Sequence, residues 1–205
     1  MSRFVTLAAR ALDRVRMLWG DCGGGDHPTV RYAEPLADPC PLTPDQAAIE
    51  AAIGPLLQGC RVLHVGTGDA GFAMRHARSV AHIDSITVRA VEVDAADCLR
   101  IPNHRALLLD KYSVDLAKLP GNYDLVIDNN PTSFACCNAH ARRMFAAYAA
   151  LLAPNGMIVT HRRGAEYRQR GGFKLTEARW RRQVRAVGLR PDRLDADVWT
   201  ALRSR

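Results

Sequence analysis

Long apolar runs and paired cysteines are the two features that this chain of 205 residues most clearly lacks. No stretch approaches the ~18 consecutive apolar residues of a membrane-spanning helix, and charged residues interrupt the N-terminal segment where a secretion signal needs an apolar run. We therefore predict a cytoplasmic protein without membrane contact. The six cysteines include no C-x-x-C pair and no His-x-x-x-His partner, so the spacing typical of a zinc site is missing and no metal is predicted.

Aromatic residues are also few, at 6%, but hydrophobic residues reach 48% and are enough to build the core of one domain. The net charge of +7 is local, because residues 161–190 hold ten Lys or Arg against two acidic residues. Such a segment is typical of a solvated helix face with a loop, or of a surface for an anionic substrate or nucleic acid. Since only Tyr167, Phe173 and Trp180 interleave the basic residues, a nucleic-acid partner is the weaker interpretation.

The N-terminal region differs in pattern from the rest. Apolar residues recur at helical spacing over residues 2–19, and glycines and prolines fill residues 20–43. We interpret residues 1–43 as an amphipathic helical lid on a flexible linker, and residues 44–205 as one domain. The competing interpretation packs the helix as a permanent core layer or as a homodimer contact.

The rest of the chain is organised around residues 60–78, where an apolar strand, a glycine turn and a helix follow one another. Gly66, Gly68 and Gly71 form a G-x-G-x-x-G pattern, which lets the backbone turn sharply and a nucleoside approach main-chain N–H groups. The pattern also occurs in ordinary turns, so its context must decide.

That context is an alternation of helices and strands, which implies a parallel sheet. We predict an α/β fold with a single Rossmann-like, doubly wound, mostly parallel seven-stranded sheet that ends in a hairpin. The predicted helices cover residues 44–57, 72–78, 134–152 and about 175–187, a basic loop covers residues 161–174, and the predicted strands cover residues 60–66, 85–93, 105–109, 123–127, 157–160, 189–194 and 198–202.

Acidic residues end three consecutive predicted strands, at Glu92, Asp110 and Asp128. Ligands of parallel sheets bind at the carboxyl ends of the strands, beside the point where the strand order reverses. The three carboxylates and the glycine turn therefore predict a nucleoside site.

Together with Leu-Leu-Ala-Pro-Asn-Gly-Met-Ile-Val at residues 151–159, these features resemble the class I S-adenosylmethionine-dependent methyltransferases over roughly residues 44–203. The resemblance implies S-adenosyl-L-methionine as the cofactor. It also implies the residues that contact this cofactor. The methionine part would be contacted by Gly66, Gly68 and Asp69, the ribose by Glu92 and the adenine by Asp110, and Asp128 at the end of the fourth strand would also bind the cofactor.

Finer features resemble one branch of that fold. Val91-Glu-Val-Asp94 is similar to the Glu-x-Asp of spermidine synthases, and the loop from Gly66 to Asp69 is similar to their Gly-Gly-Gly-Asp, although Thr67 departs from it. Glu92 and Asp94 are both candidates for the ribose, and we prefer Glu92.

The segment Asp128-Asn129-Asn130-Pro131 lies where the resemblance places catalytic residues. It is similar to Asp-Ser-x-Asp-Pro of aminopropyltransferases and to Asn-Pro-Pro-aromatic of amino-group methyltransferases, without matching either completely. We predict that Asp128, Asn129 and Asn130 hold an amine towards the sulfonium or accept its proton.

The resulting prediction is a methyltransferase that acts on a small molecule, either anionic or amine-bearing. The alternatives are aminopropyl or aminobutyryl transfer in a spermidine synthase-like enzyme, an NAD-dependent oxidoreductase, and an RNA-modifying methyltransferase.

Overall fold

The computed structural model describes residues 42–133, 137–167 and 173–203. The predicted lid and linker lie outside these residues, except for residues 42 and 43. The described elements, in chain order, are α2 (Pro44–Ile53), η1 (Gly54–Leu56), β1 (Arg61–Val65), α3 (Gly71–His76), β2 (His82–Thr87), α4 (Ala90–Leu99), β3 (His104–Leu108), η2 (Val114–Lys118), β4 (Tyr123–Asp128), α5 (Asn138–Leu151), β5 (Leu152–His161), α6 (Arg162–Glu166), α7 (Glu177–Ala186), β6 (Leu189–Arg193) and β7 (Val198–Arg203).

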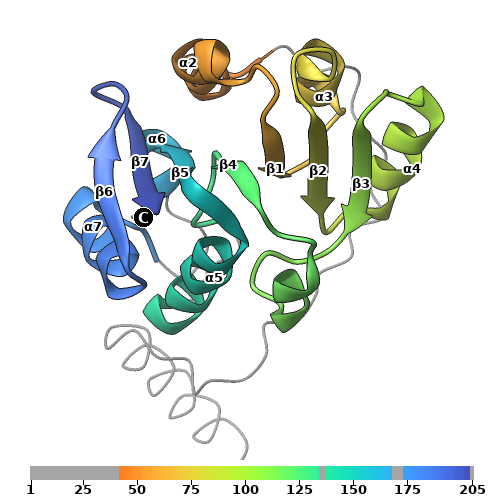
Figure 1. Ribbon diagram of the computed structural model, residues 1–205. Helices are drawn as coiled ribbons and strands as arrows, with labels where there is room; N and C mark the ends of the chain where they lie inside the picture. The colour runs from red at the N-terminus through yellow and green to blue at the C-terminus, as the bar shows by residue number, and fades with distance from the viewer. Residues whose placement is uncertain (1–41, 134–136, 168–172, 204–205) are drawn as a thin grey trace, which may run out of the picture.

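The strands form one sheet in the order β3-β2-β1-β4-β5-β7-β6 (Figure 1). β1 to β5 are parallel, whereas β7 runs antiparallel to both β5 and β6. The strand order reverses between β1 and β4, because the chain builds outward from β1 to β3 and then returns to the other side of β1. This arrangement confirms the predicted seven-stranded, doubly wound fold.

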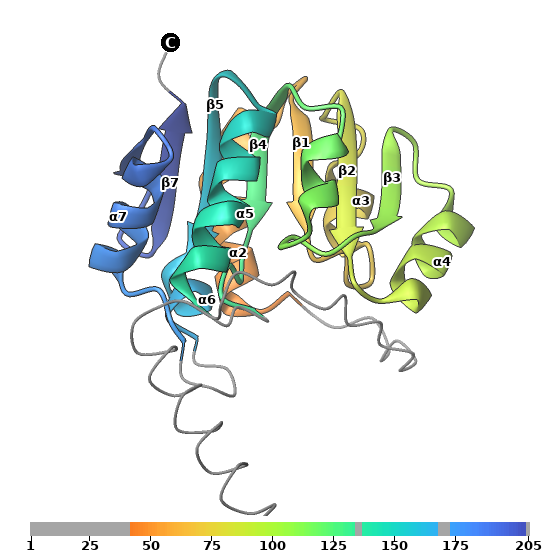
Figure 2. The same cartoon turned by 90° about the horizontal axis from the view of Figure 1, so that it is seen from below.

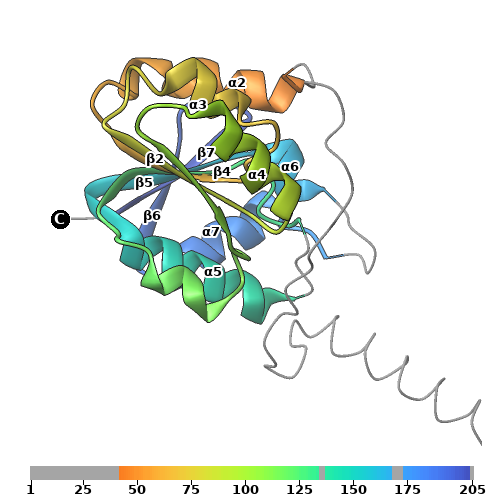
Figure 3. The same ribbon diagram turned by 90° about the vertical axis from the view of Figure 1, so that its right-hand side faces the viewer.

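Helices cover both faces of the sheet, with α2 and α3 on one side and α5 and α7 on the other (Figures 2 and 3). Each face has its own core. Ile53, Phe72 and Ile127 belong to the core under α2 and α3, and Phe145 and Trp180 belong to the core under α5 and α7. Strands buried on both faces are mostly apolar, and the short apolar runs at the centres of β1 and β4 agree with this double cover.

A buried carboxylate of β2 bonds to side chains of β3 and β4. Asp84 is fully buried and accepts hydrogen bonds from Arg105 Nε at 2.8 Å and from the Tyr123 hydroxyl at 2.6 Å, and it pairs with His82 Nε2 at 3.1 Å. Desolvation raises the pKa of Asp84, but these hydrogen bonds outweigh it and hold the pKa below the ordinary value of 3.8.

Several predicted elements differ from the structure. The helix predicted over residues 44–57 ends at Ile53 and is followed by η1, and the strand predicted over residues 157–160 begins at Leu152. The strand predicted for residues 85–93 is wrong beyond Thr87, because the chain turns there and enters α4. Val91 and Val93 fit a period of two, yet the structure buries Glu92 and Ala96, which are one helical turn apart. Glu92 therefore lies in the first turn of a helix, and Asp94 is exposed on the same helix. Within the predicted basic loop, α6 begins directly after β5.

Among the helices of the described ranges, none has the length and apolar character needed to cross a membrane. Within the same ranges, no group of three or more His, Cys, Asp or Glu side chains is arranged to hold a metal ion.

Candidate active site

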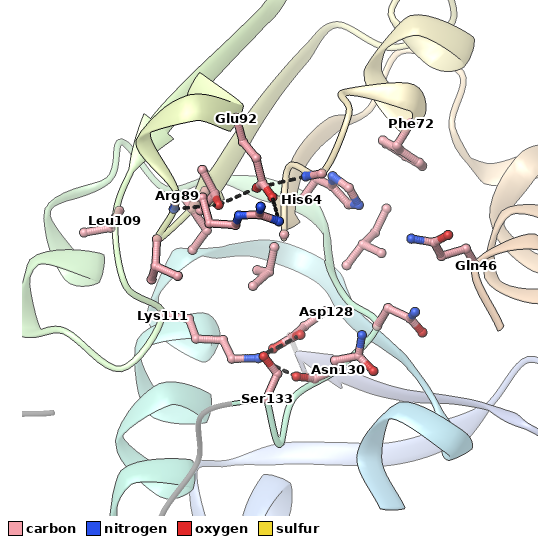
Figure 4. Close-up of a pocket in the computed structure, with 18 of the residues that line it drawn as sticks. Gln46, His64, Phe72, Arg89, Glu92, Leu109, Lys111, Asp128, Asn130 and Ser133 are labelled. Carbon is pink, nitrogen blue, oxygen red and sulfur yellow. Dashed lines mark hydrogen bonds and ion pairs between the residues drawn. The ribbon is translucent and has the colours of Figure 1, made fainter. Parts of the chain in front are cut away.

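A cavity of about 440 Å³ lies at the carboxyl ends of β1, β2, β3 and β4, and α2 forms part of its wall (Figure 4). Its volume falls in the range of roughly 300–1,000 Å³ that small-molecule sites occupy. The glycine turn, the residues after β2 and β3, and the segment after β4 all line it. The predicted ligand site and the cavity therefore coincide in the fold.

The glycine turn contributes Gly66 and Gly68 to the cavity wall. Both have positive φ, at 93° and 54°, and a side chain there would be strained. Space is open where a Cβ would stand on either residue, so a ligand can approach the backbone. Asp69 does not line the cavity, and its Oδ1 instead accepts the N–H of Gly71 at 2.9 Å. Of the three residues predicted for the methionine part, the structure brings two to the cavity.

Glu92 reaches the cavity from α4 and not from a strand end. Its Oε2 accepts the Thr87 hydroxyl at 2.6 Å and the Gly68 N–H at 3.2 Å, and its Oε1 pairs with Arg89 at 3.1 Å. Thus Glu92 joins the end of β2 to the glycine turn. Arg89 lies just after the end of β2, where an acid was predicted. The sequence did not predict Arg89 as a cavity residue, because the predicted strand extended to residue 93.

Asp110 lies two residues beyond the end of β3, lines the cavity and is 4% exposed. Its Oδ1 accepts the Tyr112 N–H at 2.8 Å, which fixes the turn after β3. The next residue, Lys111, is also buried, and its side chain points towards Asp128 at the end of β4 (Figure 4).

Asp128 ends β4 and is 1% exposed. Lys111 Nζ lies 3.2 and 3.1 Å from its two oxygens, and the Tyr148 hydroxyl of α5 donates to Oδ2 at 2.9 Å. Burial raises the pKa of Tyr148 well above its ordinary value, so the phenol keeps its proton and remains a donor. Lys111 and Tyr148 are 17 and 20 residues from Asp128, and the sequence offered no local signal for either contact.

The segment after β4 is held from several elements. Asn129 Nδ2 donates to Asp45 of α2 at 2.6 Å, and the Asn130 carbonyl accepts from Lys111 at 2.5 Å. A Cβ on Gly164 of α6 would fall on the Asn129 carbonyl oxygen, far inside contact distance, so α6 and this segment pack backbone to backbone. Asn129 lines the cavity, but its Oδ1 is buried and has no hydrogen-bond partner.

The cavity is electronegative. Four carboxylates line it, from Glu50, Glu92, Asp110 and Asp128, against the two cations Arg89 and Lys111, which is a formal balance of −2 for the lining residues. Arg75 lies outside the lining, pairs with Glu50 at 2.5 Å and offsets one of these negative charges. The ring of His64 also lines the cavity and stacks on Phe72 at 4.7 Å. Desolvation lowers the pKa of His64 to about 4, so this imidazole adds no charge near neutral pH. Such a cavity favours a cationic ligand.

The basic segment does not provide an aromatic surface for stacked bases. Phe173 and Trp180 are 7% and 1% exposed and belong to the core, and only Tyr167 of the three predicted aromatics is exposed.

The strand order, the antiparallel β7 and a ligand cavity at the switch point define the Rossmann-like fold of the class I S-adenosylmethionine-dependent methyltransferases. No protein-family model matches the chain, and no curated protein sequence matches it.

Solved structures do share the fold. One is an S-adenosylmethionine-bound aminopentose methyltransferase from Micromonospora echinaspora, with a TM-score of 0.59 and 18% identity over 77% of this chain and 88% of that chain. Another is the N-methyltransferase NodS from Bradyrhizobium japonicum in complex with S-adenosylhomocysteine, with a TM-score of 0.60 and 16% identity over 79% and 88%. A third is the cyclase SpnF, with a TM-score of 0.57 and 23% identity over 89% and 71%. At these identities the likeness shows the fold alone.

Proposed function

We propose that this protein is an S-adenosyl-L-methionine-dependent methyltransferase that acts on a small molecule with an amine nucleophile. The observation that carries the proposal is the electronegative cavity at the switch point of this fold, with an open glycine turn on one side. A sulfonium cofactor is a cation, and a cavity with a formal balance of −2 suits it.

The residues present fit the cofactor. The backbone of Gly66 and Gly68 would hold the methionine part, where a Cβ would obstruct its approach. Asp110 would accept from the adenine amine. Glu92 would accept from the ribose hydroxyls, and for this it must exchange at least one of its present donors, of which Arg89 is the one cation and has a side chain that is 30% exposed.

When bound, the cofactor supplies a methyl group on a positively charged sulfur. The chain's part is to orient the nucleophile and to exclude water. Asn130, which is exposed and lines the cavity, would accept an N–H of the substrate amine and so aim its lone pair at the methyl carbon. Asn129 Oδ1 is buried and would do the same only after its side chain moves. Asp128 already holds two donors and is assigned to positioning this segment, with an indirect role in the transfer.

The other candidate functions have less support. The Glu-x-Asp similarity to spermidine synthases rested on a strand end, and those residues lie in α4. An antiparallel β7 between β5 and β6 has no place in the strand order 3-2-1-4-5-6 of dinucleotide folds. RNA modification would need a surface that the buried Phe173 and Trp180 do not form. The cyclase among the similar structures illustrates that this fold by itself does not decide the reaction.

Ligand-induced stabilisation tests the proposal. We expect S-adenosyl-L-methionine and S-adenosyl-L-homocysteine, each at 100 times its Kd, to stabilise the folded chain by about 2.7 kcal/mol. For a domain of this size that is a rise in Tm of about 5–10 °C. NAD serves as the control and is expected to leave the Tm unchanged. A chain stabilised by NAD and by neither sulfur ligand would contradict the proposal.

A further inference from the structure

A lysine ammonium is enclosed in the cavity wall. Lys111 is 8% exposed, and its Nζ lies 3.1–3.2 Å from both oxygens of Asp128 and 2.5 Å from the carbonyl oxygen of Asn130. The same nitrogen lies 5.5 Å from the centre of the Tyr112 ring. Three acceptor atoms thus meet the three hydrogens of one ammonium group, which is the number that a protonated lysine donates.

The carboxylate opposite it is equally well defined. Asp128 accepts from Lys111 on both oxygens and from the Tyr148 hydroxyl on Oδ2, so donors surround an ionised carboxylate. Burial lowers the pKa of Lys111 and the charge of Asp128 opposes this change, with Asp110 acting in the same direction as Asp128. The pair is therefore a neutral unit made of two opposite charges inside the wall of the ligand cavity.

The position of the pair gives it a consequence for ligand charge. Figure 4 shows Lys111 and Asp128 on one side of the cavity and Arg89 and Glu92 on the opposite side. For a ligand that lies between the two sides, the negative charge of Asp128 is largely offset by the positive charge of Lys111. Without Lys111 the same cavity would carry a formal balance of −3, and its preference for a cation over a neutral molecule of the same shape would increase.

We propose that Lys111 sets how strongly the cavity discriminates the sulfonium cofactor from its neutral thioether product. The inference rests on the proposed function. Methyl transfer removes the positive charge from sulfur, so an uncompensated carboxylate at the cavity would stabilise the reactant more than the transition state and slow the reaction. Lys111 reduces this ground-state stabilisation by offsetting the charge of Asp128. It therefore determines specificity through Asp128 and needs no contact with the substrate.

Binding measurements test this without a known substrate. The readout is the ratio of the Kd of S-adenosyl-L-homocysteine to the Kd of S-adenosyl-L-methionine, obtained by calorimetry. Lys111→Gln removes the charge and keeps a donor for Asn130, and we expect the ratio to rise on the order of tenfold, as for a unit charge about 10 Å away at an effective dielectric constant of about 20. Asp128→Asn removes the opposing carboxylate, and burial then lowers the pKa of Lys111 further, so this variant is measured over a pH series. We expect its ratio to fall below the wild-type ratio at the acidic end, where Lys111 is protonated, and to return towards it as the pH rises and Lys111 loses its proton.

Two variants serve as controls. Lys118→Gln makes the same substitution in η2, where the side chain is 78% exposed and pairs with Asp115, and it should leave the ratio at the wild-type value. Lys111→Arg keeps the charge and should also retain the wild-type ratio.

The outcomes separate the inference from the proposed function. Ratios within twofold of wild type in both Lys111→Gln and Asp128→Asn overturn the inference while the proposed function stands. A wild-type chain that binds neither ligand contradicts both. If Lys111→Gln does not fold, Asp128→Asn decides alone, because it preserves the shape of the side chain and an acceptor for Tyr148.

Discussion

Glu92 offers the sharpest single perturbation, because the structure moves it from a strand end to a helix and gives its carboxylate defined partners. Replacing it with alanine removes the acceptor for the buried Thr87 hydroxyl and for the Gly68 N–H. Asp94 provides the matched control, since it is a carboxylate two residues along the same helix, is exposed, and was the rival candidate for the ribose.

The expected loss of stability follows from those contacts. A hydrogen bond to a charged group contributes about 1.5–3 kcal/mol, and this applies to the short Thr87 contact at 2.6 Å. The contact from the Gly68 N–H is longer, at 3.2 Å, and Gly68 is an exposed residue, so we assign it about 0.5–1 kcal/mol. The contact with the partly exposed Arg89 adds little. We expect Glu92→Ala to lower the free energy of unfolding by about 2–3 kcal/mol, and Asp94→Ala to change it by less than about 0.5 kcal/mol.

Ligand affinity gives the second readout. We expect Glu92→Ala to weaken S-adenosyl-L-homocysteine binding by about 1–3 kcal/mol, since the ribose loses its acceptor and the glycine turn loses its anchor. Urea unfolding and calorimetry measure the two effects separately. Equal effects of the two substitutions, or a larger effect of Asp94→Ala, would show that the register of α4 and the assignment of Glu92 are wrong.

Three further predictions concern other parts of the chain. Gly164→Ala places a Cβ against the Asn129 backbone and is expected to destabilise the fold by about 1–3 kcal/mol in urea unfolding, whereas Gly54→Ala, where a Cβ meets nothing within 4 Å, should have no such effect. Asp84→Asn should lower the free energy of unfolding by about 2–3 kcal/mol near neutral pH. Because the pKa of Asp84 is lowered in the folded chain, this difference should persist above the ordinary value of 3.8 and shrink as the pH falls through the folded pKa. A difference that grows in acid would contradict the hydrogen-bond assignment. Deletion of residues 1–30 should leave a folded chain that binds S-adenosyl-L-methionine but transfers methyl groups poorly, as expected for a lid, and an insoluble or fully active truncated chain would exclude that role.

Patterns along the chain were sufficient for much of the fold. An apolar run, a glycine turn and a helix start are local features, and they predicted β1, the turn and α3. Asp110 and Asp128 were placed correctly because each marks the change from apolar to polar residues as the chain leaves a strand, and the carboxyl ends of parallel strands meet at one edge.

The same local reasoning misplaced the end of β2. Val91 and Val93 satisfy a period of two, so they predicted an extended strand, although the same residues also fit a helix. Tertiary packing selects the helix for these residues, because a helix buries Ala96 and lets Glu92 reach both Thr87 and the glycine turn. The identity of the acid at the cavity was thus predicted from the sequence, and its geometry was not.

The chemistry of the cavity wall required the tertiary structure altogether. Lys111, Asp128 and Tyr148 come from three separate parts of the chain, and nothing in the spacing of the sequence indicates that an ammonium, a carboxylate and a phenol will meet. The close approach of Gly164 to Asn129 is of the same kind. A linear pattern records which residues are apolar and at what period, and therefore determines the elements and their order. Pairing between buried polar groups depends on the packed fold, since only the fold brings distant residues within hydrogen-bond distance.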